Sequence, residues 1–225
     1  MSVEVTELLC HSGNCGGART AGNIRYLVVH YTGNDGDTAK NNAVYFRDNV
    51  VKASAHYFVD DDAVYRSVPD LQTAWAVGGS LYVGAQESGG GTMYGVITNA
   101  NSISVELCGT MGDGSRRASE KTLARAAELI RELMAKYHIS IANVYRHFDV
   151  TGKRCPAYLL EEQAWADFKA RLTDRTPAPY AKEAVEWAWG SGILLGDELG
   201  DLRLSQPCTR QQMAVFLHRF WKLLT

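Results

Sequence analysis

The sequence has no long apolar run and almost no net charge. No segment approaches the ~20 consecutive apolar residues that a membrane-spanning helix needs. Its 23 lysines and arginines nearly balance 25 aspartates and glutamates, leaving a formal charge of −2, whereas nucleic-acid-binding domains usually concentrate basic residues on one face. The sequence therefore predicts a folded protein with neither a transmembrane segment nor a nucleic-acid partner.

A secretory leader is also missing from the first residues, MSVEVTELLCHSG. Signal peptides begin with a basic segment followed by an apolar core, and neither is present here. We expect synthesis in the cytoplasm without a signal peptide, so any action outside the cell requires another route of release.

Cysteines are few and widely spaced. An odd count of five does not indicate a disulfide framework. Cys10 and Cys15 could pair across HSGN or stay reduced, and the reduced state is favoured because a protein made in the cytoplasm meets a reducing environment. Cys108 lies in an apolar segment typical of a buried small hydrophobe, and Cys208 has no identifiable partner.

Apolar periodicity predicts alternating strands and helices up to about residue 172. The expected strands are 24–31, a hairpin within 54–69, 102–107, and a short strand within 141–150 that continues as a loop. The expected helices are 37–50, 119–137 and 159–172. Residues 78–99 are rich in glycine and predict a long loop, which in a compact domain is often functional.

A proline-containing linker, TDRTPAPY (173–180), predicts two domains, 1–173 and 180–225. The second reads as helix, glycine-centred turn, loop and helix, a small all-α helical hairpin. Fewer than 50 residues are too few to build much of a core. We expect this hairpin to pair with copies of itself or to lean on the first domain.

Two histidines and a cysteine form a candidate metal site. His30 ends the apolar run IRYLVVHY, while His147 and Cys155 flank a turn that contains Gly152 and Pro156. Two imidazoles and one thiolate leave the fourth corner of a zinc site open, as catalytic zinc requires. The alternatives are a packing role for His30 and a buried Cys155 that merely lies near a surface His147 in sequence.

Glu106 and Lys153 complete a hydrolytic set. Glu106 lies in the alternating segment SISVEL, and Lys153 precedes Cys155 by two residues. A metal, a carboxylate and an ammonium are the parts needed to hydrolyse an unactivated amide. The alternatives are a solvated charge at a strand edge for Glu106 and an ordinary loop lysine for Lys153.

Four segments make residues 20–172 resemble a known family: YLVVHYTGN, SAHYFVDD, NSISVELCG and YRHFDVTGKRCP. They resemble, in this order, the zinc-dependent N-acetylmuramoyl-L-alanine amidases of the type 2 fold, which includes peptidoglycan recognition proteins. The resemblance implies an α/β fold with a mixed central β-sheet flanked by helices. It also implies a Zn²⁺ enzyme that cuts the amide between N-acetylmuramic acid and L-alanine of peptidoglycan.

The resemblance also implies roles for individual residues. The family's metal ligands correspond to His30, His147 and Cys155, and its catalytic glutamate and lysine correspond to Glu106 and Lys153.

His56, in SAHYF, recurs in the family as well. Substrate contact, support of a ligand and packing all stay open for it, and Tyr57 is expected in the core. The wider family uses a tyrosine near here, and Ala55 at that position shifts more of the chemistry onto Glu106.

The tail resembles an S-layer homology repeat through AKEAVEWAW and GILLGDELGDLRLSQPCTRQQMAVFL. That family's Thr-Arg-Ala-Glu is TRQQ at 209–212 here, so its acidic member is missing. Such repeats typically come in threes and bind secondary cell-wall polysaccharide, and Arg210 is the predicted contact because its planar fork suits carboxylates. One repeat suggests a homo-oligomer, and a packing or dimerisation module is the alternative.

An amidase domain, a wall-binding tail and no leader together resemble a phage or prophage endolysin, which waits in the cytoplasm and acts at the cell wall after release. Two other functions stay open. A recognition module would hold peptidoglycan without cutting it, although such relatives usually lose the thiolate that Cys155 supplies. A cytoplasmic recycling amidase would act on soluble muropeptides, although the tail argues against it.

Overall fold

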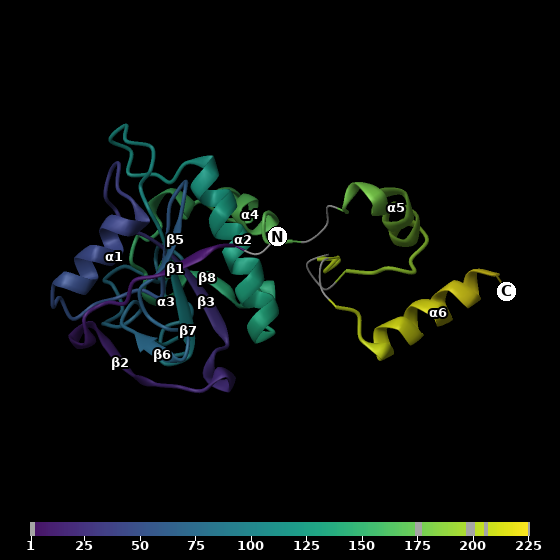
Figure 1. Ribbon diagram of the computed structural model, residues 1–225, viewed down its shortest axis with the longest axis horizontal. Coiled ribbons are helices and arrows are strands. Elements are labelled where there is room, and N and C mark those ends of the chain that lie inside the picture. Colours follow the sequence, from purple (N-terminus) through teal and green to yellow (C-terminus); the bar gives the residue numbers. More distant parts are fainter. Residues whose placement is uncertain (1–2, 174–176, 197–200, 205–206, 225) are drawn as a thin grey trace. The chain divides into compact units, whose positions relative to one another are not determined.

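The computed structural model describes residues 3–173, 177–196, 201–204 and 207–224. The chain forms two compact units, Met1–Ala170 and Arg171–Thr225 (Figure 1). The predicted linker 173–180 begins close to this division, although its residues 174–176 lie outside the described part.

A six-stranded mixed sheet forms the centre of the first unit, in the order β1-β5-β4-β7-β3-β8. Along the sheet the strands are β1 Val5–Glu7, β5 Val64–Arg66, β4 Tyr57–Val59, β7 Ser102–Leu107, β3 Tyr26–Tyr31 and β8 Val144–Arg146. Only the β4–β5 hairpin is antiparallel; the other four pairings are parallel. A separate antiparallel pair consists of β2 Cys15–Ala18 and β6 Gln72–Ala74.

Four α-helices surround the central sheet: α1 Ala39–Asp48, α2 Glu120–Tyr137, α3 His147–Thr151 and α4 Glu162–Ala170. In Figure 1, α1 lies on one side of the sheet, and α2 and α4 lie on the other. Short 3₁₀ turns are η1 Ser12–Asn14, η2 Ala21–Asn23, η3 Ile141–Asn143 and η4 Ala157–Leu159. The α/β class with a mixed sheet between helices is therefore confirmed.

Side-chain caps explain where the two longest helices of this unit begin. The hydroxyl of Thr38 accepts a hydrogen bond from the Asn41 amide at the start of α1, and Ser119 accepts one from Thr122 at the start of α2. These bonds satisfy amides that have no partner within the first turn.

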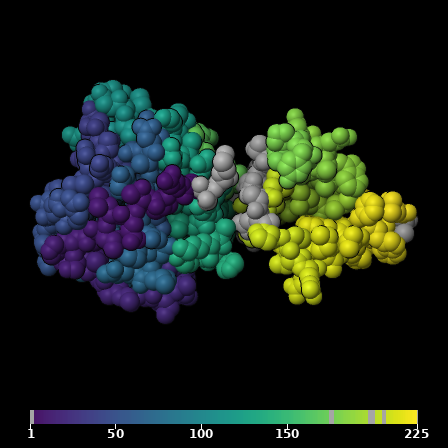
Figure 2. All heavy atoms as spheres, in the orientation of Figure 1, coloured from purple at the N-terminus to yellow at the C-terminus, as the bar shows by residue number. Residues whose placement is uncertain are grey.

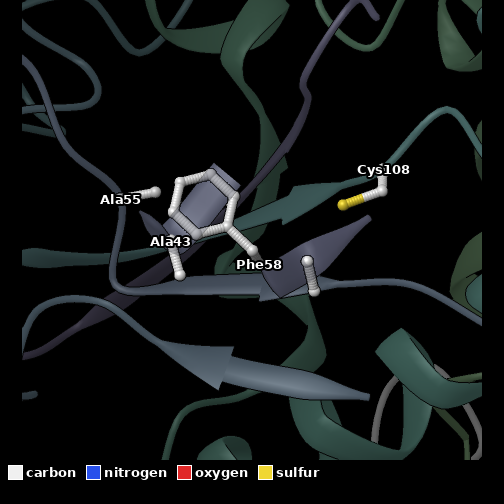
Figure 3. Packing of buried hydrophobic residues seen from close by; sticks show 5 residues of the cluster. Ala43, Ala55, Phe58 and Cys108 are labelled. Carbon is white, nitrogen blue, oxygen red and sulfur yellow. The ribbon is translucent and has the colours of Figure 1, made fainter. Parts of the chain in front are cut away.

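The core between α1 and the sheet is built from small residues around one aromatic ring (Figure 3). Ala43 of α1 packs with Ala55, Phe58 and Cys108, which are at most 1% exposed. The Phe58 ring stacks on Phe46 with 5.4 Å between centroids. Cys108 is thus a buried small hydrophobe, as predicted, and all five cysteines are free thiols.

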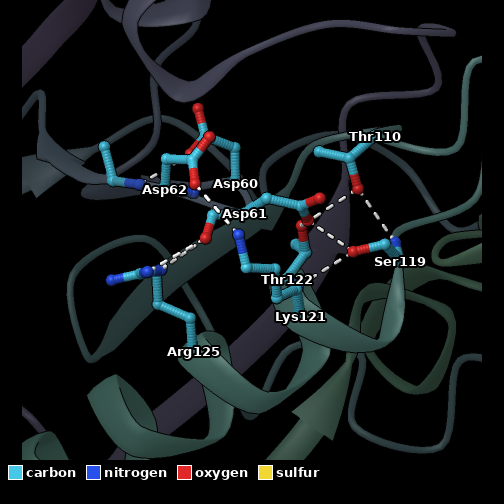
Figure 4. Close-up of polar contacts among 9 residues, drawn as sticks. Asp60, Asp61, Asp62, Thr110, Ser119, Lys121, Thr122 and Arg125 are labelled. Atoms are coloured by element: carbon cyan, nitrogen blue, oxygen red, sulfur yellow. Dashed lines mark hydrogen bonds and ion pairs between the residues drawn. The ribbon is translucent and has the colours of Figure 1, made fainter.

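The turn between β4 and β5 joins this hairpin to α2 (Figure 4). Asp61 accepts hydrogen bonds from the hydroxyls of Ser119 and Thr122, and its carbonyl accepts two from the guanidinium of Arg125. Asp60 holds the turn itself by accepting the amides of Asp62 and Ala63. The acidic run therefore has a structural role at the start of α2.

The second unit contains the helices α5 Lys182–Gly190 and α6 Arg210–Leu224, preceded by the 3₁₀ turn η5 Pro179–Ala181. Thr209 and Gln212 cap α6 reciprocally, since each side chain accepts the other's backbone amide. In TRQQ (209–212), Gln212 therefore supplies the cap that a glutamate at this position could also supply. Residues 197–200 and 205–206 of the S-layer-like segment lie outside the described part.

Among the described residues, no helix combines the length and apolarity needed to cross a bilayer.

Candidate metal centre and active site

The structure brings His30, His147 and Cys155 together. His30 lies near the end of β3, His147 is the first residue of α3, and Cys155 follows that helix. One side-chain donor atom from each lies within 4.8 Å of the others. The imidazole centroids are 4.6 Å apart, and His30 Nδ1 is 4.0 Å from Cys155 Sγ. All three side chains are buried.

The donor atoms have the chemistry of a zinc site. His30 Nε2 and His147 Nδ1 are buried and make no hydrogen bond within the described structure. Burial lowers the pKa of His147 to about 4, and that of His30 well below its usual value, so both imidazoles are neutral, the state that binds metal. Burial also raises the pKa of Cys155 to about 12, so ionisation of its thiol requires a cation close by.

Strand register places Glu106 beside His30. The two residues are direct partners on the parallel strands β7 and β3, and Glu106 Oε1 lies 3.8 Å from His30 Nδ1. Both lie toward the carboxyl ends of their strands, the edge at which open α/β sheets place their ligands. Burial raises the pKa of Glu106 to about 7, although the Lys153 ammonium opposes this shift.

Lys153 and Glu106 line one open pocket of about 540 Å³. Asn41 and Tyr45 of α1 form part of its wall, together with Asp37 from the loop before that helix. Lys153 itself is exposed. A carboxylate and an ammonium thus face a cavity that a substrate can enter, beside three buried side chains that could hold a metal ion.

Comparison with known proteins identifies the family. Residues 20–158 match the family model described as N-acetylmuramoyl-L-alanine amidase. The chain belongs to this amidase family. The amidase BlyA of Bacillus subtilis (strain 168) is 35% identical over 156 residues, which cover 66% of this chain and 41% of BlyA. The amidase CwlH of the same strain is 32% identical over 171 residues, which cover 75% and 60% respectively.

Solved structures share the amidase-family fold. The catalytic domain of XlyA superposes with a TM-score of 0.59 at 31% identity, covering 76% of this chain and 99% of that domain. PlyL superposes with a TM-score of 0.60 at 29% identity, covering 79% and 100%. The chain spans about half the length of curated relatives that it matches.

The helix α3 corrects the sequence analysis, which expected a loop after the short strand β8. Its five residues end at Gly152, whose φ of 79° favours glycine. A β-carbon there would lie 2.2 Å from the Ala85 β-carbon. The turn predicted at Gly152 is therefore present, but His147 is presented by a helix that this glycine terminates.

The long loop 78–99 holds α3 in place. It contains no regular helix or strand, as predicted. Three of its backbone amides donate to carbonyls of α3: Tyr82 to Thr151, Gly91 to Phe148, and Met93 to Asp149, at 2.8–2.9 Å. The bonds to Thr151 and Asp149 satisfy carbonyls that a five-residue helix cannot pair internally, whereas the Phe148 carbonyl also accepts the amide of Gly152. The loop thereby fixes the orientation of the element that carries His147, a candidate metal ligand, in this amidase-family chain.

Sequence reasoning missed Arg146, the residue immediately before α3, whose side chain helps to hold this helix in place. Its guanidinium is 4% exposed and pairs with Asp149 at 2.7 Å. It also donates to the carbonyls of Leu159 and Leu160, and so joins α3 to the segment after Cys155. The available signal was an arginine three residues before an aspartate at a strand end, a pattern too common to single out.

We expect Arg146→Leu to lower the free energy of unfolding by about 3–5 kcal/mol, because it leaves Asp149, 7% exposed, without its buried counter-charge. Chemical denaturation measures the change. The control is Arg47→Leu, which removes the solvent-exposed Arg47–Asp48 pair and should change stability little. Equal effects of the two substitutions would contradict the organising role of Arg146.

His56 lies inside the protein. It is 1% exposed, and its ring nitrogens contact Arg19 Nη2 at 2.7 Å, Ser104 Oγ at 3.0 Å and the Gln72 carbonyl at 3.1 Å. These contacts favour the packing alternative, and substrate contact by His56 stays a prediction. Tyr57 is in the core, as predicted, at 3% exposure with its hydroxyl donating to Asp70.

Arg210 is the first residue of α6 and is exposed within the second unit. Its predicted contact with an anionic glycan stays a prediction.

Proposed function

We propose that this chain is a zinc-dependent peptidoglycan amidase of the endolysin type, which cleaves the bond between N-acetylmuramic acid and L-alanine. The observation that carries the proposal is the convergence of His30, His147 and Cys155 beside Glu106 and Lys153 in a chain of the amidase family. Zinc is the fitting ion, because two neutral imidazoles and one thiolate match its ligand preference and leave a position open.

A zinc ion held by these side chains would polarise the substrate carbonyl and lower the pKa of a bound water toward ~7. Glu106 accepts a proton from the attacking water and later gives it to the leaving amine. Its raised pKa of about 7 suits both transfers near neutral pH. The Lys153 ammonium stabilises the negative oxygen that develops on the former carbonyl.

Identification of the broken bond tests this function. The full chain should release fragments from purified peptidoglycan with new L-alanine amino termini and intact glycan strands, as identified by mass spectrometry. Binding without any product would support the recognition-module alternative. Cleavage of soluble muropeptides but not of intact walls would support the recycling alternative.

Lys153→Ala should lower the turnover of a soluble muropeptide by ~10²–10³-fold, the usual effect of removing one oxyanion donor. Zinc content and the unfolding transition should change little, because the side chain is exposed. The matched variant Lys153→Arg keeps the charge and should retain more activity than the alanine variant. Near-normal turnover by Lys153→Ala would refute the assigned role.

We further propose that the second unit binds the cell wall, with secondary cell-wall polysaccharide as its partner, and that the protein acts there after release from the cytoplasm. Deleting residues 176–225 should leave hydrolysis of soluble muropeptide almost unchanged. Hydrolysis of intact walls should fall, because a second binding site raises effective concentration at the surface. Loss of activity on the soluble substrate would instead make the tail part of the catalytic fold.

A further inference from the structure

The pocket that contains Glu106 and Lys153 has one unbalanced charge on its lining. Among the described residues that line it, the charged side chains are those of Glu106, Lys153 and Asp37. The first two have opposite signs, so the charge left over is the Asp37 carboxylate. Asp37 shares a wall of the pocket with Asn41 and Tyr45 of α1, which are both exposed. Figure 2 shows the side chains of α1, in blue, at the surface of the first unit.

Hydrogen bonds hold the Asp37 carboxylate in place without neutralising it. Its Oδ1 accepts the backbone amide of Gly109 at 2.6 Å, and its Oδ2 accepts the side-chain amides of Asn34 and Asn42 at 3.1 and 2.6 Å. All three donors are uncharged. Gly109 follows β7 by two residues, and a β-carbon there would overlap the Asn34 carbonyl oxygen. The negative charge is therefore fixed at one position, beside the strand that carries Glu106.

The shape of the pocket favours the peptide half of the substrate over the glycan half. Its volume of about 540 Å³ lies within the range of ~300–1,000 Å³ that takes a drug-sized ligand, the size of a few amino-acid residues. A glycan strand continues in both directions from the muramic acid and needs open surface, whereas the stem peptide is a branch with an end. The N-acetylated sugars beside the scissile amide are uncharged. A fixed carboxylate in the pocket can therefore discriminate by charge only among peptides.

We propose that Asp37 makes this pocket select stem peptides by charge, so that a carboxamide or an amine near the scissile bond is accepted and a free carboxylate is disfavoured. The inference rests on the proposed amidase function and adds the class of peptide that is cut. A free carboxylate near Asp37 is repelled, a carboxamide of the same size is not, and an amine is attracted. At about 4 Å in water, one such charge pair changes affinity about fivefold.

Hydrolysis of two matched muropeptides by the full-length protein tests the proposal. The probes are N-acetylmuramoyl peptides that differ only in the residue after L-alanine, which bears a free α-carboxylate in one probe and a carboxamide in the other. The wild type should cut the carboxamide probe with a kcat/KM about three- to tenfold higher, the effect of one charge pair at a solvated site. This ratio should shrink in about 0.5 M salt, because salt screens the repulsion.

Substitutions of Asn41 change the charge of the pocket and leave Asp37 in place. Asn41 is exposed and joins the cap of α1 through its backbone amide, so a new side chain there keeps that bond. Asn41→Lys should lower the carboxamide-to-carboxylate ratio to about 1 or below, and Asn41→Asp should raise it above the wild-type value. The matched control is Ala142→Lys, which adds the same charge at an exposed residue before the amino end of β8. It should leave the ratio unchanged.

The results separate the charge preference from the amidase function. Equal cutting of the two probes by the wild type overturns selection by Asp37 and leaves the amidase function intact. A preference that Asn41→Lys leaves unchanged, or that Ala142→Lys lowers equally, also overturns it. Failure to cut either probe contradicts the proposed function instead. Calorimetric affinities of the wild type for the two probes then still measure the preference, and equal affinities overturn it.

Discussion

Replacing Cys155 with serine should remove bound zinc and abolish amide hydrolysis together. A hydroxyl is a poor substitute for the thiolate in a site of two imidazoles and one sulfur. Substitutions that only support a ligand cost 10–100-fold in metal affinity or activity, so loss of the ligand itself should cost more. Metal analysis of the purified protein and turnover of a soluble muropeptide give the two readouts.

Two controls separate loss of a ligand from other causes. Cys208→Ser replaces an exposed thiol in the second unit and should keep both zinc and activity. Wild-type protein treated with a chelator should match Cys155→Ser in its unfolding transition, because both lack the same metal–ligand bonds. Full zinc occupancy in Cys155→Ser would refute the proposed ligand set.

Replacing Glu106 with alanine should lower turnover by ~10²–10⁴-fold, the usual contribution of a general base. Zinc should remain bound, because the carboxylate lies 3.8 Å from His30 but is not one of the three converging donors. Glu106→Gln is the matched variant, since it keeps the shape of the side chain and removes only its ability to take a proton. Both variants should lose similar activity if proton transfer is the role.

Stability distinguishes this role from a structural one. Burial raises the pKa of Glu106 from 4.5 to about 7, so in the metal-free protein the ionised side chain opposes folding. Its unfavourable contribution grows as pH rises from 4.5 to about 7 and is then constant. Metal-free Glu106→Gln should therefore be at least as stable as the metal-free wild type above pH 7. Reduced stability together with near-normal turnover would mean that Glu106 is structural.

The sequence predicted those elements whose apolar pattern is long or continuous. The run that contains His30 is β-branched and aromatic, and it forms β3, a largely buried strand between β7 and β8. The helix α2 shows a clear apolar face and a serine cap. The strands β1, β2 and β6 were missed because isolated segments of three or four residues are too short to show periodicity. Their formation depends on pairing, of β1 with β5 and of β2 with β6.

The site shows the same division. Motif resemblance and the turn at Gly152 predicted that His30, His147 and Cys155 would lie together, and the structure brings these side chains together; their role as metal ligands stays a prediction. The pairing of His30 with Glu106 follows once β3 and β7 are neighbours. The helix α3 was not predicted, because its five residues, HFDVT, have no helical pattern of their own. The conformation of α3 depends on hydrogen bonds from loop 78–99, which is distant in sequence, and on Arg146, which belongs to no distinctive motif.

The loop 78–99 has a consequence for anyone who wishes to re-engineer this protein. Long surface loops are ordinarily the first choice for inserting a tag or a second module. Here three backbone amides of the loop bind carbonyls of the helix that begins at His147, so a change in the loop's length would displace His147, a proposed metal ligand. The exposed segment 111–117 makes no such contact with α3 and is the better position for an insertion.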